Sequence, residues 1–341
     1  MRKILIFLNP LYALFVFIKN ALYDANIIKS KSYDVPVLVV GNLTAGGSGK
    51  TPMVEYLIRI YLERKITPIV LSRGYGRKTK GFYEVKPEAN AIDVGDEPLQ
   101  MKRKFNEVSI FVCENRVKGI DKILDEYKPQ GKFIIICDDA FQHRRLNAGY
   151  YILLWSFDDV QSNRWLLPAG NFRETSASRT RSDLQVITKV PEHTPNTILK
   201  EIADELEFDE TPLFFSAINY GSFYDFESNP IYLEEANVLL VTGIANPKPL
   251  VKYLQTISIS AAHYPFADHH NFTQKDLEKL VTKFKERRFD YVLFTEKDYV
   301  RIKDIWPKEI PAIYLSIKCE ILKDQVGFER RVLAFPERYF D

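Results

Sequence analysis

The 341-residue sequence has little of what marks several large classes of protein. Its three cysteines (Cys113, Cys137 and Cys319) are odd in number and widely spaced, so they match neither a disulfide framework nor a zinc site and favour a reducing compartment. The net charge is also small: 47 Lys and Arg against 45 Asp and Glu give a formal net charge of +2. This argues against a general nucleic-acid binder, which usually has a strong basic excess. Repeats and low-complexity stretches are absent. With 46% hydrophobic residues, the composition is that of a folded globular chain of about two domains.

The amino-terminal segment is where charge and hydropathy are unevenly distributed. Residues 1–31 hold five Lys or Arg and one acid, Asp24, so this stretch carries +4 and the other 310 residues sum to −2. Residues Ile4 to Ile18 carry no charge. As a helix that run would span about 22 Å, short of the roughly 30 Å hydrocarbon core of a bilayer. Pro10 would kink or restart a helix there.

Three interpretations of this segment compete. A signal peptide needs a small-residue cleavage site after the apolar run, and residues 19–23 are a poor one. A buried core helix is the plainest alternative. The third is a monotopic anchor that enters one leaflet, with basic residues at the head groups.

From Val35 onward, short apolar runs alternate with segments of helical character. A helix of about a dozen residues is predicted after Lys50, because Met53, Leu57 and Ile60 recur at helical spacing. Continuous apolar strands separated by helices predict a parallel α/β sheet covered on both faces. The predicted strands are Val35–Val40, Pro68–Leu71, Ser109–Cys113, Phe133–Cys137 and Tyr151–Leu154.

A polar stretch, residues 163–182, interrupts this rhythm and is either a mobile loop or an inter-domain linker. Strands are predicted again beyond it, at Leu184–Val190, Pro212–Ala217, Ala236–Thr242, Tyr291–Thr295 and Ala312–Ile317. We therefore predict an amino-terminal segment (1–30), a core domain (31–160), a smaller α/β domain (161–318) whose late strands can return to the core, and a carboxy-terminal tail (319–341).

A glycine-rich turn, residues 41–52, directly follows the first predicted strand. Its backbone N–H groups and the start of the next helix are suited to phosphate oxygens. Lys50 would reach the β- and γ-phosphates of a nucleotide, and the Thr51 hydroxyl a Mg²⁺ ion. Thr44 stands where the strict motif has glycine. The predicted phosphate-binding residues are Thr44, Ala45, Gly46, Gly47, Ser48, Gly49, Lys50 and Thr51.

Other polar motifs follow the predicted strands, at the edge where open α/β sheets bind ligands. Asp138 and Asp139 end an apolar strand, as the metal-binding acid of phosphate-loop proteins does. Arg73 and Arg116 follow two other strands, where guanidinium groups can neutralise phosphates. The run 95–98 is either an acidic turn that starts a helix or a pair of carboxylates that faces the nucleotide.

The run Asp268-His269-His270 lies far downstream. Adjacent residues on a turn point in different directions and no third ligand is near, which disfavours a metal site. A histidine oriented by a carboxylate for proton transfer is better supported, with a purely structural turn as the alternative.

Taken in order, the motifs resemble those of the tetraacyldisaccharide 4′-kinase family, the lipid A precursor kinases of Gram-negative bacteria. The resemblance runs from the apolar segment to about residue 318. The motifs are GNLTAGGSGKTP (41–52), SRGYGRK (72–78), GDEP (95–98), DDAFQH (138–143), PAGNFRE (168–174), TGIANP (242–247), DHH (268–270) and TEKD (295–298).

The resemblance implies transfer of the γ-phosphate of ATP to the 4′-hydroxyl of a tetraacylated glucosamine disaccharide 1-phosphate, giving lipid IVA at the cytoplasmic face of the inner membrane. It also implies a phosphate-loop fold of two α/β domains joined by a β-ribbon, and an amino-terminal helix that contacts membrane lipids. Nucleic acid is not an expected partner. Asp138 and Asp139 would lie near Mg²⁺ with Thr51. Many family members have glycine where this sequence has Ala140, which matters only if that position needs a positive φ.

By the same resemblance, Asp96 and His269 match the pair that takes the proton from the sugar hydroxyl, assembled only when the two domains close. Arg173 and Glu174 match a loop that closes over nucleotide. The other expected site residues are Arg73, Tyr75, Glu97, Arg116, Gln142 and His143.

Two other functions stay open on the residues alone. One is a membrane-associated nucleotide switch, but the run 295–298 places its lysine one position too late for a guanine-reading motif. The other is a soluble small-molecule kinase whose apolar helix is part of the core. Dependence of the activity on lipid would separate the latter from a lipid kinase.

Overall fold

The computed structural model describes residues 7, 9–205 and 211–340. Its strands are β1 (Val37–Asn42), β2 (Thr67–Ser72), β3 (Tyr83–Glu84), β4 (Ser109–Val112), β5 (Phe133–Asp138), β6 (Tyr150–Ser156), β7 (Leu184–Thr188), β8 (Leu213–Asp225), β9 (Pro230–Ile231), β10 (Asn237–Thr242), β11 (Ser260–Pro265), β12 (Tyr291–Thr295) and β13 (Ala312–Ile321). Its α-helices are α1 (Asn9–Asp24), α2 (Lys50–Glu63), α3 (Ala91–Val94), α4 (Asp96–Lys104), α5 (Arg116–Lys122), α6 (Phe157–Val160), α7 (Asn196–Glu205), α8 (Lys248–Thr256), α9 (Gln274–Arg287), α10 (Glu296–Ile302) and α11 (Gln325–Glu337). A π-helical turn covers Ile123–Tyr127 and a 3₁₀ helix covers Ser176–Arg181.

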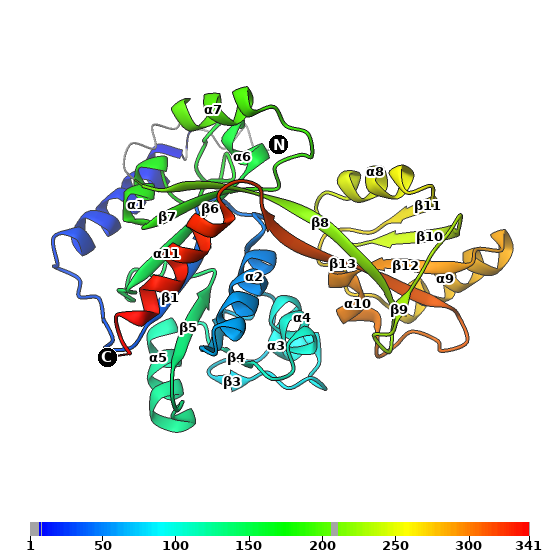
Figure 1. Cartoon of the computed structure of the whole chain (residues 1–341), viewed down its shortest axis with the longest axis horizontal. Coiled ribbons are helices and arrows are strands. Elements are labelled where there is room, and N and C mark those ends of the chain that lie inside the picture. The colour runs from blue at the N-terminus through cyan, green and yellow to red at the C-terminus, as the bar shows by residue number, and fades with distance from the viewer. Residues whose placement is uncertain (1–6, 8, 206–210, 341) are drawn as a thin grey trace.

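The strands form two parallel units joined by one antiparallel ribbon (Figure 1). The first unit has the strand order β7-β6-β1-β5-β2-β4, with the short β3 antiparallel at its edge. The second unit has the order β11-β10-β12-β13. The long strand β8 pairs parallel with β7 at its start and antiparallel with β13 further on, and so links the units. The predicted α/β class is confirmed.

Both faces of the first unit are covered, as the continuous apolar strands predict. Leu38 and Val40 of β1 pack on the side of α2, while Val37 and Val39 point into a separate core on the other face. All four side chains are buried. Burial on alternate sides explains why these strands contain no polar alternation in the sequence.

Three sequence-based boundaries need correction. The strand predicted at Leu184–Val190 was assigned to the second unit. It forms β7 and pairs with β6, so it belongs to the first unit. The start of β8 pairs with β7 and therefore belongs to the first unit as well. The expected tail contains the end of β13 and helix α11, whose Val332 carbonyl accepts a hydrogen bond from Tyr61 of α2. The polar stretch 163–182 is not a linker, because Asn171 and Phe172 pair with residues of the first unit.

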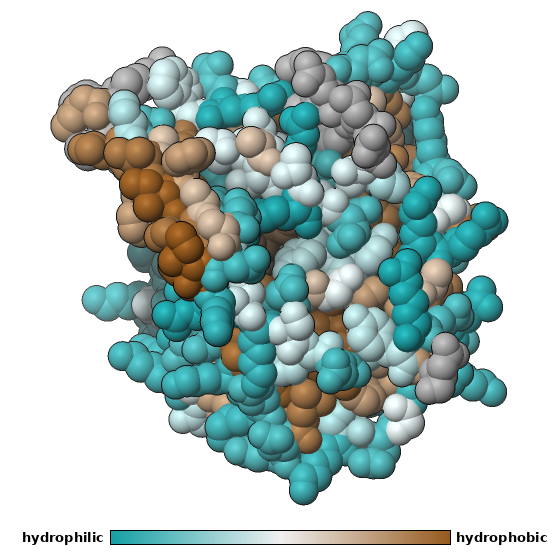
Figure 2. Space-filling view, turned by 90° about the vertical axis from the view of Figure 1, so that its left-hand side faces the viewer, coloured by the Kyte–Doolittle hydropathy of each residue, from teal (hydrophilic) through white to brown (hydrophobic). Residues whose placement is uncertain are grey.

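Helix α1 lies against the first unit with one face outward. Helix α1 begins at Asn9 with Pro10 in its first turn, a position that tolerates proline. The earlier part of the apolar run lies largely outside the described residues. Apolar side chains form a ridge on an otherwise polar face of the molecule (Figure 2). Its exposed members in α1 are Leu11, Leu14, Phe15, Phe17 and Ile18. None of the helices in the described ranges has the length and hydropathy that crossing a bilayer requires.

Candidate active site

The glycine-rich turn connects β1 to α2 and adopts a conformation that needs glycine at two positions. Gly49 is the amino-terminal cap of α2 with a φ of 78°, and Gly46 has a φ of 141°. Side chains other than glycine rarely adopt this region. Thr44 does not have a positive φ, and its hydroxyl instead donates to Asp159 at 3.0 Å. Threonine at the position of the missing glycine is therefore compatible with the turn.

Lys50 starts α2 and lies among oxygen atoms. Its Nζ donates to Asn42 Oδ1 at 3.1 Å and lies 3.4 Å from Asp139 Oδ1. The hydroxyl of Ser48, in the same turn, is buried and has no partner among the described residues. Lys189, which follows β7, donates to the carbonyl of Gly47. Desolvation lowers the pKa of Lys189, and the charge of Lys50 lowers it further, while the carboxylates of Asp159 and Asp158 oppose this shift.

Asp138 ends β5 beside the glycine-rich turn. Its Oδ2 accepts a hydrogen bond from Ser72 at 2.9 Å, while Oδ1 is buried without a partner in the described chain. Burial, with the adjacent charge of Asp139, raises the pKa of Asp138 to about 6. Asp139 takes the left-handed conformation, with a φ of 48°, and Ala140 does not, so alanine is accommodated.

These residues fit a magnesium ion. The described residues contain no group of three His, Cys, Asp or Glu that could hold a metal. Mg²⁺, however, is commonly bound by one or two carboxylates together with substrate phosphates and water. Asp138 supplies an unpartnered carboxylate oxygen and Asp139 a second carboxylate, and Thr51, in the first turn of α2, supplies a hydroxyl.

A second set of charged groups joins the two units. Asp96 and Glu97 begin α4 of the first unit, His269 follows β11, and Lys297 and Arg301 lie one turn apart on α10. We call these five residues the Asp96 cluster. Asp96 Oδ2 lies 3.1 Å from His269 Nδ1 and accepts from Arg301 at 2.5 and 2.8 Å. The expected pair is therefore in contact across the two units in this conformation.

The donors around His269 indicate its tautomer. Lys297 Nζ lies 3.0 Å from Nε2 and 2.8 Å from Glu97 Oε1. An ammonium can only donate, so Nε2 accepts. Nδ1 lies 3.1 Å from both Asp96 Oδ2 and Arg301 Nη2. With Nε2 as the acceptor, the ring proton lies on Nδ1, where the carboxylate oxygen of Asp96 is the neighbour that can accept it. Burial alone would raise the pKa of Asp96, but hydrogen bonds from His269 and Arg301 outweigh it and lower the pKa to about 2. Asp96 is therefore ionised and orients the imidazole.

The two arginines expected to neutralise phosphates lie in different surroundings. Arg116 is only 2% exposed and donates to the backbone carbonyls of Cys113, Asp138 and Asp139, at 3.1, 2.6 and 3.1 Å. It therefore holds the ends of strands together, and its expected role as a direct phosphate contact is corrected to support of the carboxylates. Arg73 is exposed. Tyr75 is 65% exposed, with its ring edge-on to His269.

The remaining predicted residues surround Asp139. Arg173 donates to Asp139 Oδ1 at 3.1 Å, and Gln142 donates to the carbonyl of Asn42 at 2.8 Å. Burial and neighbouring cations lower the pKa of His143 to about 4. Glu174 is 2% exposed and paired with Arg181, so it supports the loop from inside and does not face a nucleotide.

Several site residues were missed from the sequence. Lys297 and Arg301 follow the predicted strand 291–295, and their spacing of four places both on one face of a helix. That spacing could have identified them, although the TEKD motif was used only for the family resemblance and as a rival guanine-reading signal. Lys189 carried no signal, because its position depends on how β7 joins the first sheet.

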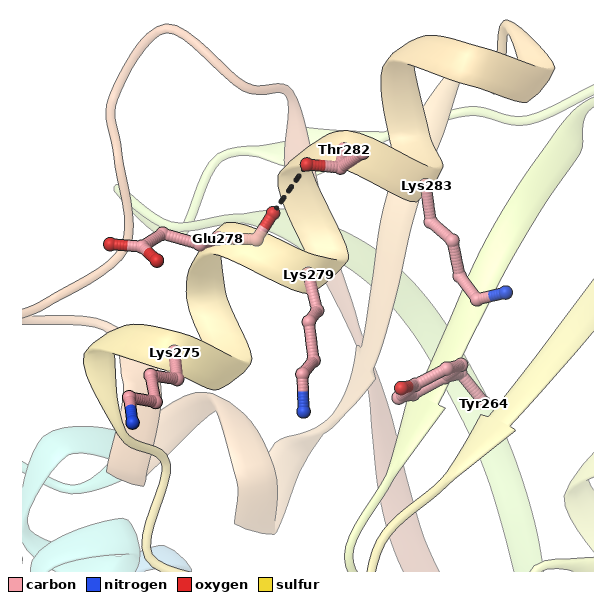
Figure 3. A pocket seen from close by; sticks show the side chains of 6 residues that line it. All are labelled: Tyr264, Lys275, Glu278, Lys279, Thr282 and Lys283. Atoms are coloured by element: carbon pink, nitrogen blue, oxygen red, sulfur yellow. Dashed lines mark hydrogen bonds between the residues drawn. The ribbon is translucent and has the colours of Figure 1, made fainter.

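Two other features are not part of this site. His270 pairs with Asp276 at 3.0 Å and not with His269. A pocket of about 550 Å³ lies over α9 and has no residue of the glycine-rich turn or of the Asp96 cluster in its lining (Figure 3). Its lining residues are Tyr264, Lys275, Glu278, Lys279, Thr282 and Lys283.

Comparison with known proteins gives the family. The profile of the family described as Tetraacyldisaccharide-1-P 4′-kinase matches residues 1–336. A tetraacyldisaccharide 4′-kinase of Flavobacterium johnsoniae is 40% identical over 341 residues, 98% of this chain and 97% of that protein. One of Phocaeicola vulgatus is 37% identical over 332 residues, 92% of this chain and 89% of that protein. A crystal structure of LpxK from Aquifex aeolicus in complex with ATP has a TM-score of 0.77 and 27% identity, covering 98% of this chain and 99% of that one. The chain thus belongs to the tetraacyldisaccharide-1-phosphate 4′-kinase family.

Proposed function

We propose that this chain is an ATP-dependent lipid kinase that transfers the γ-phosphate of ATP to the 4′-hydroxyl of tetraacyldisaccharide 1-phosphate, giving lipid IVA. It is a phosphotransferase with an alcohol group as acceptor, as its family membership indicates. The observation that carries the proposal is the 3.1 Å contact of His269 with Asp96, because a hydroxyl nucleophile needs a positioned proton acceptor.

The glycine-rich turn is the proposed nucleotide site. Its backbone N–H groups and Lys50 bind the β- and γ-phosphates, and Lys189 lies close enough to add positive charge. When bound by Thr51, Asp138 and Asp139, Mg²⁺ supplies neutralisation of the charge that develops on the transferred phosphoryl group. Arg173 holds Asp139, and Arg116 holds the backbone of both acids.

The Asp96 cluster is the proposed proton-transfer site. The 4′-oxygen bonds to the γ-phosphorus, the bond from that phosphorus to the leaving oxygen of ADP breaks, and the hydroxyl proton passes to His269 Nε2. Lys297 occupies Nε2 in the structure and must give way to the hydroxyl; Glu97, 2.8 Å away, remains as its partner. Asp96 stays ionised and stabilises the imidazolium that forms.

Helix α1 is the proposed membrane contact, at the cytoplasmic face of the inner membrane. Leu11, Phe15 and Phe17 are 66%, 65% and 69% exposed, which is unusual for large apolar side chains unless they meet lipid or a partner. The excess of positive charge in residues 1–31 suits anionic head groups. The same surface brings the enzyme to its acylated substrate, and nucleic acid has no part in this function.

The test is product formation by the purified full-length chain in detergent micelles with ATP, Mg²⁺ and tetraacyldisaccharide 1-phosphate. Mass spectrometry should detect the disaccharide with one added phosphate, and Lys50→Ala should abolish it. No product from folded, ATP-binding protein would overturn the proposal. Equal phosphorylation of a water-soluble, deacylated disaccharide would instead indicate a soluble sugar kinase.

A further inference from the structure

Helix α1 is bonded to the segment that covers the glycine-rich turn, and not only packed near it. Tyr12 Oη donates to the carbonyl of Arg173 at 3.1 Å, and Asn9 Nδ2 donates to the carbonyl of Leu166 at 2.7 Å. Tyr12 packs against the core of the first unit, whereas its neighbour Leu11 is exposed. One face of α1 is thus free for lipid while the opposite face holds residues 166–173.

A first path of contacts runs from Tyr12 to Lys50. The backbone of the segment is paired with the turn, since Ala45 donates to the carbonyl of Asn171 and Arg173 donates to that of Leu43, both at 2.7 Å. The Arg173 side chain continues to Asp139 at 3.1 Å, and Asp139 lies 3.4 Å from the Nζ of Lys50.

A second path leaves α1 about two turns further along, at Lys19, and ends at the same lysine, Lys50. Lys19 Nζ donates to the carbonyl of Gln142 at 3.4 Å, and Gln142 Nε2 donates to the carbonyl of Asn42 at 2.8 Å. Asn42 Oδ1 accepts from Lys50 at 3.1 Å. Two sets of side chains therefore connect helix α1 to the cation of the phosphate loop, and they meet where Arg173 Nη1 donates to Gln142 Oε1 at 3.4 Å.

We propose that Tyr12 and Lys19 are positioning residues for the nucleotide, so that α1 organises the ATP site as well as contacting lipid. The proposal rests on the nucleotide site proposed above. Tyr12 acts through Arg173, and Lys19 acts through Gln142; each fixes a group that sets where Lys50 lies. Burial raises the pKa of the Tyr12 hydroxyl, which therefore remains a donor throughout the working range of pH.

The test compares two hydroxyl deletions on the same helix. Tyr12→Phe removes the hydrogen bond to the carbonyl of Arg173. Tyr23→Phe is the control: the Tyr23 ring lies under the guanidinium of Arg144, and its hydroxyl makes no hydrogen bond in the described part of the chain. Tyr12→Phe should raise the KM for ATP about two- to tenfold, as loss of one such bond predicts, and leave the KM for the lipid substrate unchanged. Tyr23→Phe should leave both unchanged.

A double-mutant cycle separates positioning from general packing. If Tyr12 acts through the Arg173 side chain, Tyr12→Phe should add no further increase in the KM for ATP to an Arg173→Ala background. Full additivity, an unchanged KM in Tyr12→Phe, or equal effects of Tyr12→Phe and Tyr23→Phe would each overturn the inference. ATP binding by Lys50→Ala, measured by calorimetry, is the separate check, since unaltered binding there would refute the nucleotide site itself.

Discussion

Asp138 and Asp96 are two carboxylates of one site whose surroundings are opposite. Asp138 is buried, has one oxygen without a partner in the described chain, and has its pKa raised to about 6 by burial and by Asp139. Asp96 resists the same effect of burial, because His269 and Arg301 donate to it and lower its pKa to about 2. No cation among the described residues is bonded to the carboxylate of Asp138, whereas Asp96 is bonded to the guanidinium of Arg301.

The difference separates two chemical roles. A carboxylate with an unpartnered buried oxygen gains most from an external cation, which is what a metal site requires. A carboxylate already bonded to a guanidinium is too weak a base to take a proton near neutral pH, so it orients the histidine that does. Asp138 is thus assigned to the metal and phosphate end of the reaction, and Asp96 to the hydroxyl end.

The largest effect on the hydroxyl end is expected from removal of its base. His269→Ala should lower kcat by about 10²- to 10⁴-fold, the usual contribution of a positioned general base, and change ATP affinity little. Steady-state kinetics with a separate ATP-binding measurement would check this. His270→Ala is the neighbouring control and should keep most of the activity, since His270 pairs with Asp276. Equal losses in kcat and ATP affinity for His269→Ala would contradict the proposed role.

A smaller effect is expected when Asp96 loses its guanidinium. Arg301→Met should raise the pKa of Asp96, because Arg301 is one of the two donors that lower it, and kcat should fall about tenfold. Asp96 then protonates at a higher pH, so the acidic limb of the kcat/KM profile should move upward. In an Asp96→Asn background the same substitution should leave the profile in place. A shift that persists there would show that Arg301 acts on another group.

The smallest effect concerns a third acid, Glu55 of α2, which is buried and belongs neither to the glycine-rich turn nor to the Asp96 cluster. Lys104 bridges it to Glu296 of the second unit, at 2.7 and 2.8 Å. Burial nonetheless raises the pKa of Glu55 to about 7. A raised folded-state pKa gives stability that is present below the unfolded value of 4.5 and is lost as pH rises through 7. Urea unfolding should therefore show a loss on the order of 1 kcal/mol between pH 5 and 8 that is absent in Glu55→Gln.

The fold could largely be predicted because parallel strands buried on both faces appear as continuous apolar runs. Strand β11 was not predicted, because its sequence, SAAHYP, is not a continuous apolar run. The strand lies at the edge of the sheet and has no buried residue. The sequence also could not show which sheet each later strand joins. The strand 184–188 is apolar in either unit, and only its pairing with β6 assigns it to the first.

The site was predictable where backbone conformation or strand position dictates chemistry, as in the glycine-rich turn and the acids that end β5. Arg116 was misjudged because sequence alone does not indicate whether a guanidinium faces solvent or backbone carbonyls. The role of Lys297 depends on its contact with His269, 28 positions earlier in the sequence, and on its ion pair with Glu97 of the other unit. Such contacts follow from tertiary packing and carry no local pattern.

The most direct measurement of the central claim is a Mg²⁺ titration of kinase activity in Asp138→Asn and Asp96→Asn side by side. Both substitutions keep the shape of the side chain and remove its charge. Asp138→Asn should raise the Mg²⁺ concentration needed for half-maximal rate by at least about tenfold, because it removes a metal-binding oxygen charge. Asp96→Asn should lower the maximal rate with its Mg²⁺ dependence unchanged. A shifted Mg²⁺ requirement in Asp96→Asn together with an unshifted one in Asp138→Asn would contradict the division of roles.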